Sequence, residues 1–352
     1  MIHNSPFISD FQEELHVIND AATGVQGVIA IHSTVVGPAA GGCRFWHYNS
    51  QADLMDDAVR LARGMSYKNA MAGLPFGGGK AVLHRPTGNF DRRAVFSAFA
   101  DAVAALDGQY ITAEDVGTNV ADMQTVRERT KYVAGLEAEP GKAGGDPSPW
   151  TSLGVFVSMR AAARVVFQSD LYGLTVAVQG TGNVGLGLCR LLKEAGAKLI
   201  VTDIDDSRLA AAAHELGATT VGVHEIVAAD ADIFAPCALG GTLNRETIPQ
   251  MRAKLVCGGA NNQLAAESDG ELLVERGIVY APDYVANAGG IINVSAEYLG
   301  ETTDQVRERV LAIAPRLTAI LQQSERDGTP ANVVADVLAR QIIAEGRSRA
   351  AA

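Results

Sequence analysis

The feature that most constrains the fold is a cluster of three glycines, Gly180, Gly182 and Gly185, in the sequence GTGNVG. The cluster follows the apolar segment LTVAVQ, which is typical of a buried strand, and it precedes VGLGLCRLLKEAGA, which has helical periodicity. A first glycine allows a tight turn, a second lets the backbone approach a pyrophosphate, and a third lets helix and strand close up. The sequence therefore predicts a dinucleotide-binding βαβ unit; the alternative is a glycine-rich turn without a ligand.

A second element of the same pattern is the segment KLIVTD, which ends in Asp203, 23 residues after Gly180. An acidic residue here can bind both ribose hydroxyls and would repel a 2′-phosphate, so NAD is favoured over NADP. Arg208 lies close by and leaves NADP open. The predicted cofactor-binding residues of this motif are Gly180, Thr181, Gly182, Asn183, Val184, Gly185 and Asp203.

Length and composition exclude several classes of protein. The chain has 352 residues, 47% of them hydrophobic and 20% charged, which is typical of globular domains and is long enough for two. Its net charge of -11 argues against nucleic acid and anionic membranes as partners. The start of the chain has no basic region followed by an apolar run, so we expect a cytoplasmic protein. The four cysteines lie far apart and indicate reduced thiols and no metal site.

The order of segments predicts two α/β domains. The segment KAGGDPSPW, residues 142–150, would break any helix or central strand and sets a boundary, giving domains 1–146 and 147–330. The second has alternating strands and helices, as in a doubly wound parallel sheet of Rossmann type. The first begins with the strand-like residues 25–34, and we expect a mixed sheet there. The last helices, residues 331–352, are expected to pack on the first domain.

Three polar residues of the first domain are candidates for chemistry. Lys68 lies seven residues after Leu61 on the apolar stripe of a predicted helix, where it could pair with a substrate carboxylate; the alternative is a lysine that reaches water at the helix end. Lys80 follows three glycines that would let backbone crowd a small ligand, with the lysine at its edge for proton transfer or water activation. Asp115 begins a glycine turn, where it could be catalytic or simply form the turn.

Seven segments together resemble one family, the Glu/Leu/Phe/Val amino-acid dehydrogenases. They occur in family order over nearly the whole chain: GGCRFW, GMSYKNAMAGLPFGGGKAV, ITAEDVGT, VQGTGNVG, APCALGGTLN, GGANNQL and YAPDYVANAGG. The chain is most similar to the leucine, valine and phenylalanine members. The resemblance implies NAD-dependent, reversible oxidative deamination of an L-amino acid to its 2-oxo acid and ammonia, by a homo-oligomer assembled through the first domain.

The resemblance also implies roles for individual residues. Lys68 matches the lysine that grips the substrate carboxylate, Lys80 the lysine that activates water, and Asp115 the acid that exchanges a proton with the amino group. The other implied positions are Gly42 at the carboxylate site, Asn262 near substrate, and Thr151 and Asn287 near the nicotinamide. Because deamination needs deprotonated groups, we expect activity to rise toward alkaline pH.

The implied side-chain pocket is apolar throughout, with Ala40, Ala113, Ile291 and Val294. A glutamate substrate would bury a second carboxylate there without a cationic partner, so we exclude it. Ala113 resembles the leucine and valine members, whereas Ala40 resembles the phenylalanine members. We therefore expect a branched-chain substrate, with phenylalanine as the alternative, since one or two methylenes discriminate only ~10–200-fold.

Two other classes of function remain as alternatives. A catalytically inactive NAD-binding sensor or scaffold would have no use for an inward-facing lysine. A hydroxy-acid dehydrogenase would normally use a histidine, but the seven histidines all fall outside the glycine-rich motifs. Cys43 and Asp146 depart from the residues usual in the family, and Cys43 is expected to make the protein sensitive to thiol reagents.

Overall fold

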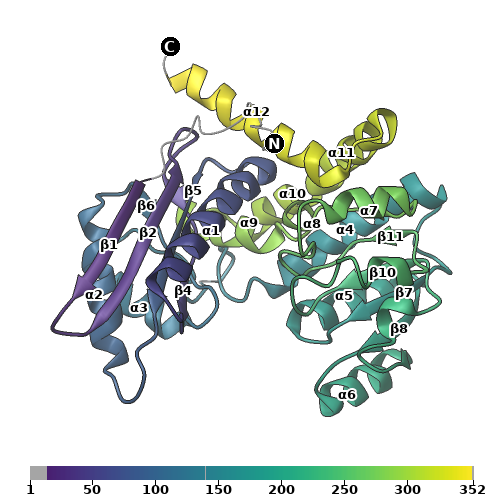
Figure 1. Cartoon of the computed structure of the whole chain (residues 1–352), viewed down its shortest axis with the longest axis horizontal. Coiled ribbons are helices and arrows are strands. Elements are labelled where there is room, and N and C mark those ends of the chain that lie inside the picture. The colour runs from purple at the N-terminus through teal and green to yellow at the C-terminus, as the bar shows by residue number, and fades with distance from the viewer. Residues whose placement is uncertain (1–13, 139, 351–352) are drawn as a thin grey trace, which may run out of the picture. The chain divides into compact units, whose positions relative to one another are not determined.

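The computed structural model describes residues 14–138 and 140–350 of the chain (Figure 1). The start of the chain, on which the expectation of a non-exported protein rests, lies mostly outside these residues. The described residues form two compact units, and the first division between them follows Gly145, one residue before the expected boundary. Residues 297–300 and the chain from Ala339 onward belong to the first unit, and the remainder from Asp146 belongs to the second.

The first unit is built on a mixed sheet in the order β1-β2-β5-β3-β6, with β4 also paired to β5. Its strands are β1 Glu14–Asp20, β2 Val25–Ser33, β3 Ala39–Ala40, β4 Cys43–Trp46, β5 Gly77–His84 and β6 Tyr110–Ile111. Its helices are α1 Gln51–Ala72, α2 Arg92–Ala105 and α3 Val120–Arg127. Strand β2 pairs antiparallel with β1 and β5, whereas β3 and β4 run parallel to β5, so the expected mixed sheet is confirmed.

Apolar residues cover both faces of this sheet, which explains why β2 is apolar almost throughout. Ile29 and Ile31 face the cluster that contains the aromatic side chains of α2. Val28 and Ala30 alternate with them and pack with α1 on the opposite face, as period-2 geometry requires (Figure 1). Ala30 pairs with Lys80 across the β2–β5 ladder, and therefore Lys80 belongs to the α1 side.

The three glycines at the start of β5 allow a close approach of protein to protein. A Cβ on Gly77 would lie 1.8 Å from the Ser33 carbonyl oxygen, and a Cβ on Gly78 would lie 2.0 Å from the Ser66 amide nitrogen in α1. The expectation that these glycines make room for a small ligand is therefore wrong. The space that their side chains would fill is occupied by β2 and α1, and Lys80 sits within β5 at 5% exposure.

The second unit contains a parallel sheet in the order β12-β11-β10-β7-β8-β9, which confirms the predicted doubly wound architecture. Its strands are β7 Thr175–Gln179, β8 Lys198–Thr202, β9 Thr219–Thr220, β10 Ile233–Pro236, β11 Leu255–Val256 and β12 Val279–Tyr280. Its helices up to the last strand are α4 Ser148–Phe167, α5 Asn183–Glu194, α6 Asp206–Leu216 and α7 Asp269–Glu275. The strand order reverses between β7 and β10, the place where such sheets bind ligands.

As the sequence predicts, the described residues after the last strand form helices and no strand: α8 Asp283–Ala286, α9 Gly289–Leu299, α10 Thr303–Leu311, α11 Ile313–Asp327 and α12 Ala331–Ala350. Helix α12 begins in the second unit and continues into the first from Ala339. No helix among the described residues is both long enough and apolar enough to cross a membrane.

All four cysteines are free thiols, and only Cys237 is partly exposed. The prediction that Cys43 confers sensitivity to thiol reagents is wrong, because Cys43 has no exposed surface. Burial raises the pKa of its thiol far above the ordinary value, and the nearby Lys80 offsets only part of that effect. Asp146 accepts a hydrogen bond at 2.9 Å from the amide of Ser148, the first residue of α4.

Candidate active site

Lys80 and Asp115 form a direct ion pair on the α1 side of the first sheet. Lys80 is held in the middle of β5, and its Nζ lies 2.7 Å from Oδ2 of Asp115. Only 6% of the Lys80 side chain is exposed, against 25% for Asp115. A lysine is rarely buried unless it is paired, so this geometry gives its position in the core an electrostatic reason.

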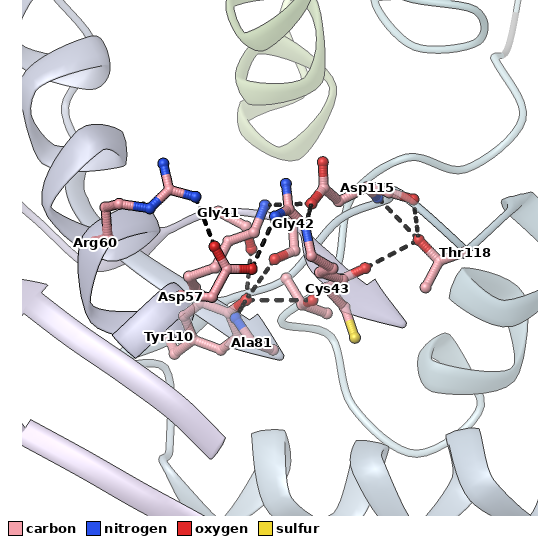
Figure 2. A network of polar contacts seen from close by, with 12 residues as sticks. Gly41, Gly42, Cys43, Asp57, Arg60, Ala81, Tyr110, Asp115 and Thr118 are labelled. Atoms are coloured by element: carbon pink, nitrogen blue, oxygen red, sulfur yellow. Dashed lines mark hydrogen bonds and ion pairs between the residues drawn. The ribbon is translucent and has the colours of Figure 1, made fainter. Parts of the chain in front are cut away.

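Asp115 enters the site from a short turn that follows β6. Its amide donates to the Thr118 hydroxyl at 2.8 Å, and that hydroxyl donates to the carbonyls of Asp115 and Cys43 at 2.8 Å and 3.1 Å (Figure 2). The backbone of Asp115 thus forms the turn that the simpler interpretation expected. The side chain contacts Lys80 and also accepts a hydrogen bond from the Val116 amide within the turn.

Arg44 is a member of the site that the sequence reasoning missed. It projects from β4, and its Nε lies 3.3 Å from Asp115 Oδ2 while a terminal nitrogen lies 2.8 Å from Asp57. Burial alone would raise the pKa of Asp115, but Lys80, Arg44 and the Val116 amide together hold that pKa below its usual value. The available signal was an arginine in the short motif GGCRFW, between two glycines and an aromatic pair.

The glycine pair before β4 lies against this ion pair. Tyr110 donates its hydroxyl proton to the Gly41 carbonyl at 2.5 Å and accepts from the Ala81 amide at 3.0 Å, which ties the pair to β5 beside Lys80 (Figure 2). A Cβ on Gly42 would lie 2.9 Å from the Cβ of Asp115. The structure therefore brings Gly42 to Asp115, and any side chain at position 42 would displace the turn.

Ala40 and Ala113 come close to the same place from neighbouring strands. Ala40 ends β3, beside β6, and is 7% exposed; Ala113 lies two residues after β6 and is 8% exposed. The Ala113 carbonyl accepts from the Cys43 amide at 2.8 Å. Both predicted pocket residues of the first unit are thus small, buried and adjacent to the turn that carries Asp115.

Lys68 is half-buried near the end of α1, on the part of the helix that is fixed to the sheet by polar contacts. The side-chain amide of Asn69 donates to the Gly77 carbonyl at 2.6 Å and to the Ala40 carbonyl at 3.3 Å. Ser66 contacts Nδ1 of the buried His32 at 2.8 Å. Helix α1 has a buried stripe, but its members after Ala58 are Ala62, Ser66 and Asn69, whereas the expected member Leu61 is half-buried.

The three glycines of the loop in the second unit differ in backbone conformation and in the space around them. Gly180 adopts a φ of +97°, which only glycine adopts readily, and a Cβ on Gly185 would lie 2.0 Å from the Gly180 carbonyl oxygen. Gly182, in contrast, has no atom within 4 Å of its would-be Cβ among the described residues. The open space at Gly182 is what a pyrophosphate against the backbone would need.

The helix that follows fits the same ligand. Gly182 is the N-cap of α5 and offers no side chain to the first amides of the helix, so these donors are available to a phosphate. Asp203, at the end of β8, accepts from the amide and hydroxyl of Thr181 at 2.6 Å and 2.9 Å. These contacts fix the loop; burial would raise the pKa of Asp203, but the hydrogen bonds from Asp205 and Thr181 lower it.

Arg208 lies close to two carboxylates, those of Asp205 and Asp203, and its charge helps to lower the pKa of Asp203. Its Nε lies 3.5 Å from Asp205, the N-cap of α6.

The other predicted residues of the second unit lie near helix ends. Thr151 is in the first turn of α4, whose next residue, Ser152, donates to the Val184 carbonyl at 2.8 Å. Asn287 is 3% exposed and donates to Asn261 at 2.9 Å, while its Oδ1 has no partner in the described part of the chain. A buried amide oxygen without a partner is a place where a ligand donor would be stabilised.

Asn262 is exposed and adopts a φ of +52°, a left-handed conformation that asparagine tolerates better than most residues. Ile291 and Val294 are both half-buried and lie three residues apart on α9, and therefore on one face of it. No group of three or more histidine, cysteine or acidic residues that could hold a metal ion occurs among the residues that the structure describes.

Comparison with protein families gives two matches that together span most of the chain. Residues 10–132 match "Glu/Leu/Phe/Val dehydrogenase, dimerisation domain", and residues 144–208 and 201–345 match "Glutamate/Leucine/Phenylalanine/Valine dehydrogenase". Leucine dehydrogenase of Geobacillus stearothermophilus is 48% identical over 332 residues, which cover 94% of this chain and 90% of that protein. Valine dehydrogenase of Streptomyces albus is 44% identical over 341 residues, covering 96% and 93%.

Solved structures agree with these matches. L-tryptophan dehydrogenase from Nostoc punctiforme superposes with a TM-score of 0.85 at 39% identity, over 96% of this chain and 97% of that one. A hetero-hexameric glutamate dehydrogenase from Thermus thermophilus superposes with a TM-score of 0.76 at 22% identity, over 96% and 89% of the two chains. This second likeness concerns the fold alone.

Proposed function

This chain belongs to the Glu/Leu/Phe/Val dehydrogenase family, and we propose that it oxidatively deaminates a hydrophobic L-amino acid, using NAD, to give the 2-oxo acid and ammonia. A branched-chain substrate is favoured. Leucine and valine dehydrogenases share 44–48% of their residues with this chain over more than nine-tenths of its length. The observation that carries the chemistry is the buried ion pair between Lys80 and Asp115, beside a turn without side chains at Gly41 and Gly42.

Each polar group then has one task in the reaction. Lys68 binds the substrate carboxylate and so fixes the orientation of the α-carbon. Asp115 takes a proton from the substrate ammonium group, and Lys80 activates the water that attacks the imino carbon. NAD supplies the acceptor for the hydride. Lys80 itself is only 5% exposed, which limits its contact with bulk water.

NAD is supported over NADP by two features of the second unit. Asp203 carries a negative charge where the adenine ribose is expected, and Arg208 is engaged by Asp205 at 3.5 Å. A 2′-phosphate would meet the Asp203 carboxylate, while Arg208, the nearby cation of α6, already faces the carboxylates of Asp203 and Asp205. Thr151 and Asn287, with its partnerless Oδ1, are our candidates for the nicotinamide end.

The residues that we propose for contact with the substrate side chain are Ala40, Ala113, Ile291 and Val294, and Asn262 is our candidate for a residue near the substrate and the nicotinamide. None of the four apolar residues can neutralise a second carboxylate, which argues against glutamate. Phenylalanine remains the alternative substrate, because the small side chain of Ala40 leaves volume that a branched aliphatic chain does not need.

The first unit also has features of an assembly surface. Strand β1 pairs on one side with β2 and carries Leu15 and Val17 at 41% and 60% exposure. We infer a homo-oligomer that covers this strand, which size-exclusion chromatography with light scattering would detect. Four free cysteines suit a reducing compartment, and we place the protein in the cytoplasm.

The test is formation of NADH at 340 nm from NAD and single L-amino acids at mildly alkaline pH. We expect turnover with leucine, isoleucine and valine, weaker turnover with phenylalanine, and none with glutamate. Lys80→Ala should abolish turnover without loss of NAD binding, which intrinsic fluorescence reports. Tight NAD binding without turnover on any amino acid would favour the inactive sensor, and a preference for phenylalanine would overturn the branched-chain assignment.

A further inference from the structure

Two cations, a lysine ammonium and an arginine guanidinium, contact the carboxylate of Asp115. Lys80 Nζ and Arg44 Nε both contact the same oxygen, Oδ2, at 2.7 Å and 3.3 Å. The proposed reaction asks Lys80 to work with water, and during that work Lys80 cannot remain a fixed partner of Asp115. A partly buried carboxylate is disfavoured when it loses its only cation, so the second cation has a purpose that the proposed function does not assign.

The guanidinium group of Arg44 is also held by a second carboxylate, that of Asp57. A terminal nitrogen of its guanidinium lies 2.8 Å from Asp57 on α1, and Asp57 also accepts from the Tyr48 hydroxyl and from Arg60, both at 2.6 Å. Asp57 is only 14% exposed and has three donors, so its carboxylate is a rigid anchor. Figure 2 shows this network extending from Arg60 and Asp57 toward Asp115 and Thr118.

We propose that Arg44 is the permanent counter-ion of Asp115, a positioning residue that keeps this carboxylate ionised and oriented while Lys80 exchanges its proton. A guanidinium does not deprotonate in proteins, whereas a lysine ammonium can. Because both cations engage Oδ2, the carboxylate is oriented with Oδ1 as the oxygen that neither of them engages. This inference rests on the proposed roles of Lys80 and Asp115.

Arg44 can be reached from solvent, which makes the inference testable by chemical rescue. Its side chain lines a cavity of about 470 Å³ together with Trp46, Tyr48, Asp53, Asp57 and Val116. Trp46 and Val116 are 55% and 49% exposed, so the cavity has an open side. A free guanidinium ion can therefore enter the space that a truncated Arg44 leaves between Asp57 and Asp115.

The charged and titratable groups around Asp115 determine what its titration reports. Lys80 and Arg44 face it from β5 and β4, Cys43 lies on the same strand as Arg44, and Tyr110 approaches from β6. Burial raises the pKa of both Cys43 and Tyr110 far above ordinary values, so neither changes charge in the working range. Loss of the Arg44 charge should therefore change the titration of Asp115 in its ion pair with Lys80.

The experiment compares Arg44→Ala with Arg60→Ala, which removes another cationic partner of Asp57, one that is half exposed and contacts the other carboxylate oxygen, Oδ1. We expect Arg44→Ala to lower kcat/KM on the order of 10²-fold, mostly in kcat. The acidic limb of its pH profile should move up by about one unit, because protons leave the pair less readily without the cation. Millimolar guanidinium should restore both kcat/KM and the position of the acidic limb in Arg44→Ala. The acidic limb of Arg60→Ala should stay at its wild-type pH.

An unmoved limb in Arg44→Ala, with no response to guanidinium, would overturn the inference and leave Arg44 a structural residue. If Arg44→Ala does not fold, Arg44→Lys and Asp57→Asn test the same point. Arg44→Lys should keep the acidic limb at its wild-type pH and should lose less activity than Asp57→Asn. A greater loss of activity in Arg44→Lys than in Asp57→Asn would refute the inference. Carboxyl ¹³C NMR of Asp115 needs no turnover. A higher pKa of Asp115 in Arg44→Ala than in wild type supports the inference even if the proposed substrate is wrong.

Discussion

Gly78→Ala is the change for which the structure gives the sharpest expectation. The new Cβ would lie 2.0 Å from the amide nitrogen of Ser66 and 2.5 Å from its Cα, whereas ordinary contact begins at 3.4 Å. The obstacle is helix backbone and cannot rotate aside. Helix α1 would have to move away from β5 by about 1.4 Å, the difference between the two distances, if the strand stayed in place.

The cost follows from that displacement. Overpacking of this kind destabilises by about 1–3 kcal/mol, and breaking the contact between Ser66 and the buried His32 adds about 1 kcal/mol. A total of roughly 3 kcal/mol would lower the Tm of the first unit by roughly 6–12 °C. Because α1 carries Lys68 and β5 carries Lys80, kcat/KM should fall on the order of 10²-fold.

Gly64→Ala is the matched control on the same helix. Gly64 is exposed, and nothing lies within 4 Å of its would-be Cβ among the described residues. Alanine in a helix interior should stabilise by about 0.5–1 kcal/mol, a rise in Tm of about 2 °C, without change in kcat/KM. Differential scanning calorimetry and steady-state kinetics measure both quantities. An unchanged Tm and kcat/KM in Gly78→Ala would refute the argument that this glycine exists to admit α1.

Two further outcomes are expected. Gly182→Ala should fold normally but bind NAD at least about tenfold more weakly in a calorimetric titration, because the new methyl group enters the space proposed for the pyrophosphate. Gly185→Ala should lose stability as well as NAD affinity. An NAD affinity of Gly182→Ala equal to that of wild type would contradict the assignment. Burial, with a smaller contribution from Arg63, lowers the pKa of His32 from 6.5 to about 4, so the unfolded chain takes up a proton between these values and the folded chain does not. Stability should therefore fall by up to about 3 kcal/mol as pH drops from 6.5 to 4, and His32→Gln should flatten this dependence in urea titrations.

The second unit was largely predictable from the sequence because its signals are local. Gly180 and Gly185 have roles that depend on backbone within a few residues, and the strands before and after them are short and apolar. The two-residue strand β9 was missed, since its threonines are exposed and give no apolar signal. Asp203 was found by spacing alone, but its contacts with Thr181 are visible only in three dimensions.

The first unit was less predictable because its key contacts join residues far apart in the chain. Asp115 meets Arg44 across 71 positions, and no pattern along the chain reports such a pairing. The glycines before Lys80 were predicted to make room for a small ligand. A glycine in a sequence indicates only that space is needed at that position, and it does not indicate what occupies the space. Ser66 fills the space at Gly78, and local sequence carries no record of that.

The position of β5 in its sheet has a consequence for how the protein acquires activity. Strands β2 and β3 are consecutive in the chain, yet β5 is inserted between them. Lys80 can meet Asp115 only after this late strand has paired with β2 on one side and with β3 and β4 on the other, which requires non-local contacts that form slowly. During refolding, turnover should therefore return later than the helical circular-dichroism signal. The time course of enzyme activity then reports when the first sheet is complete.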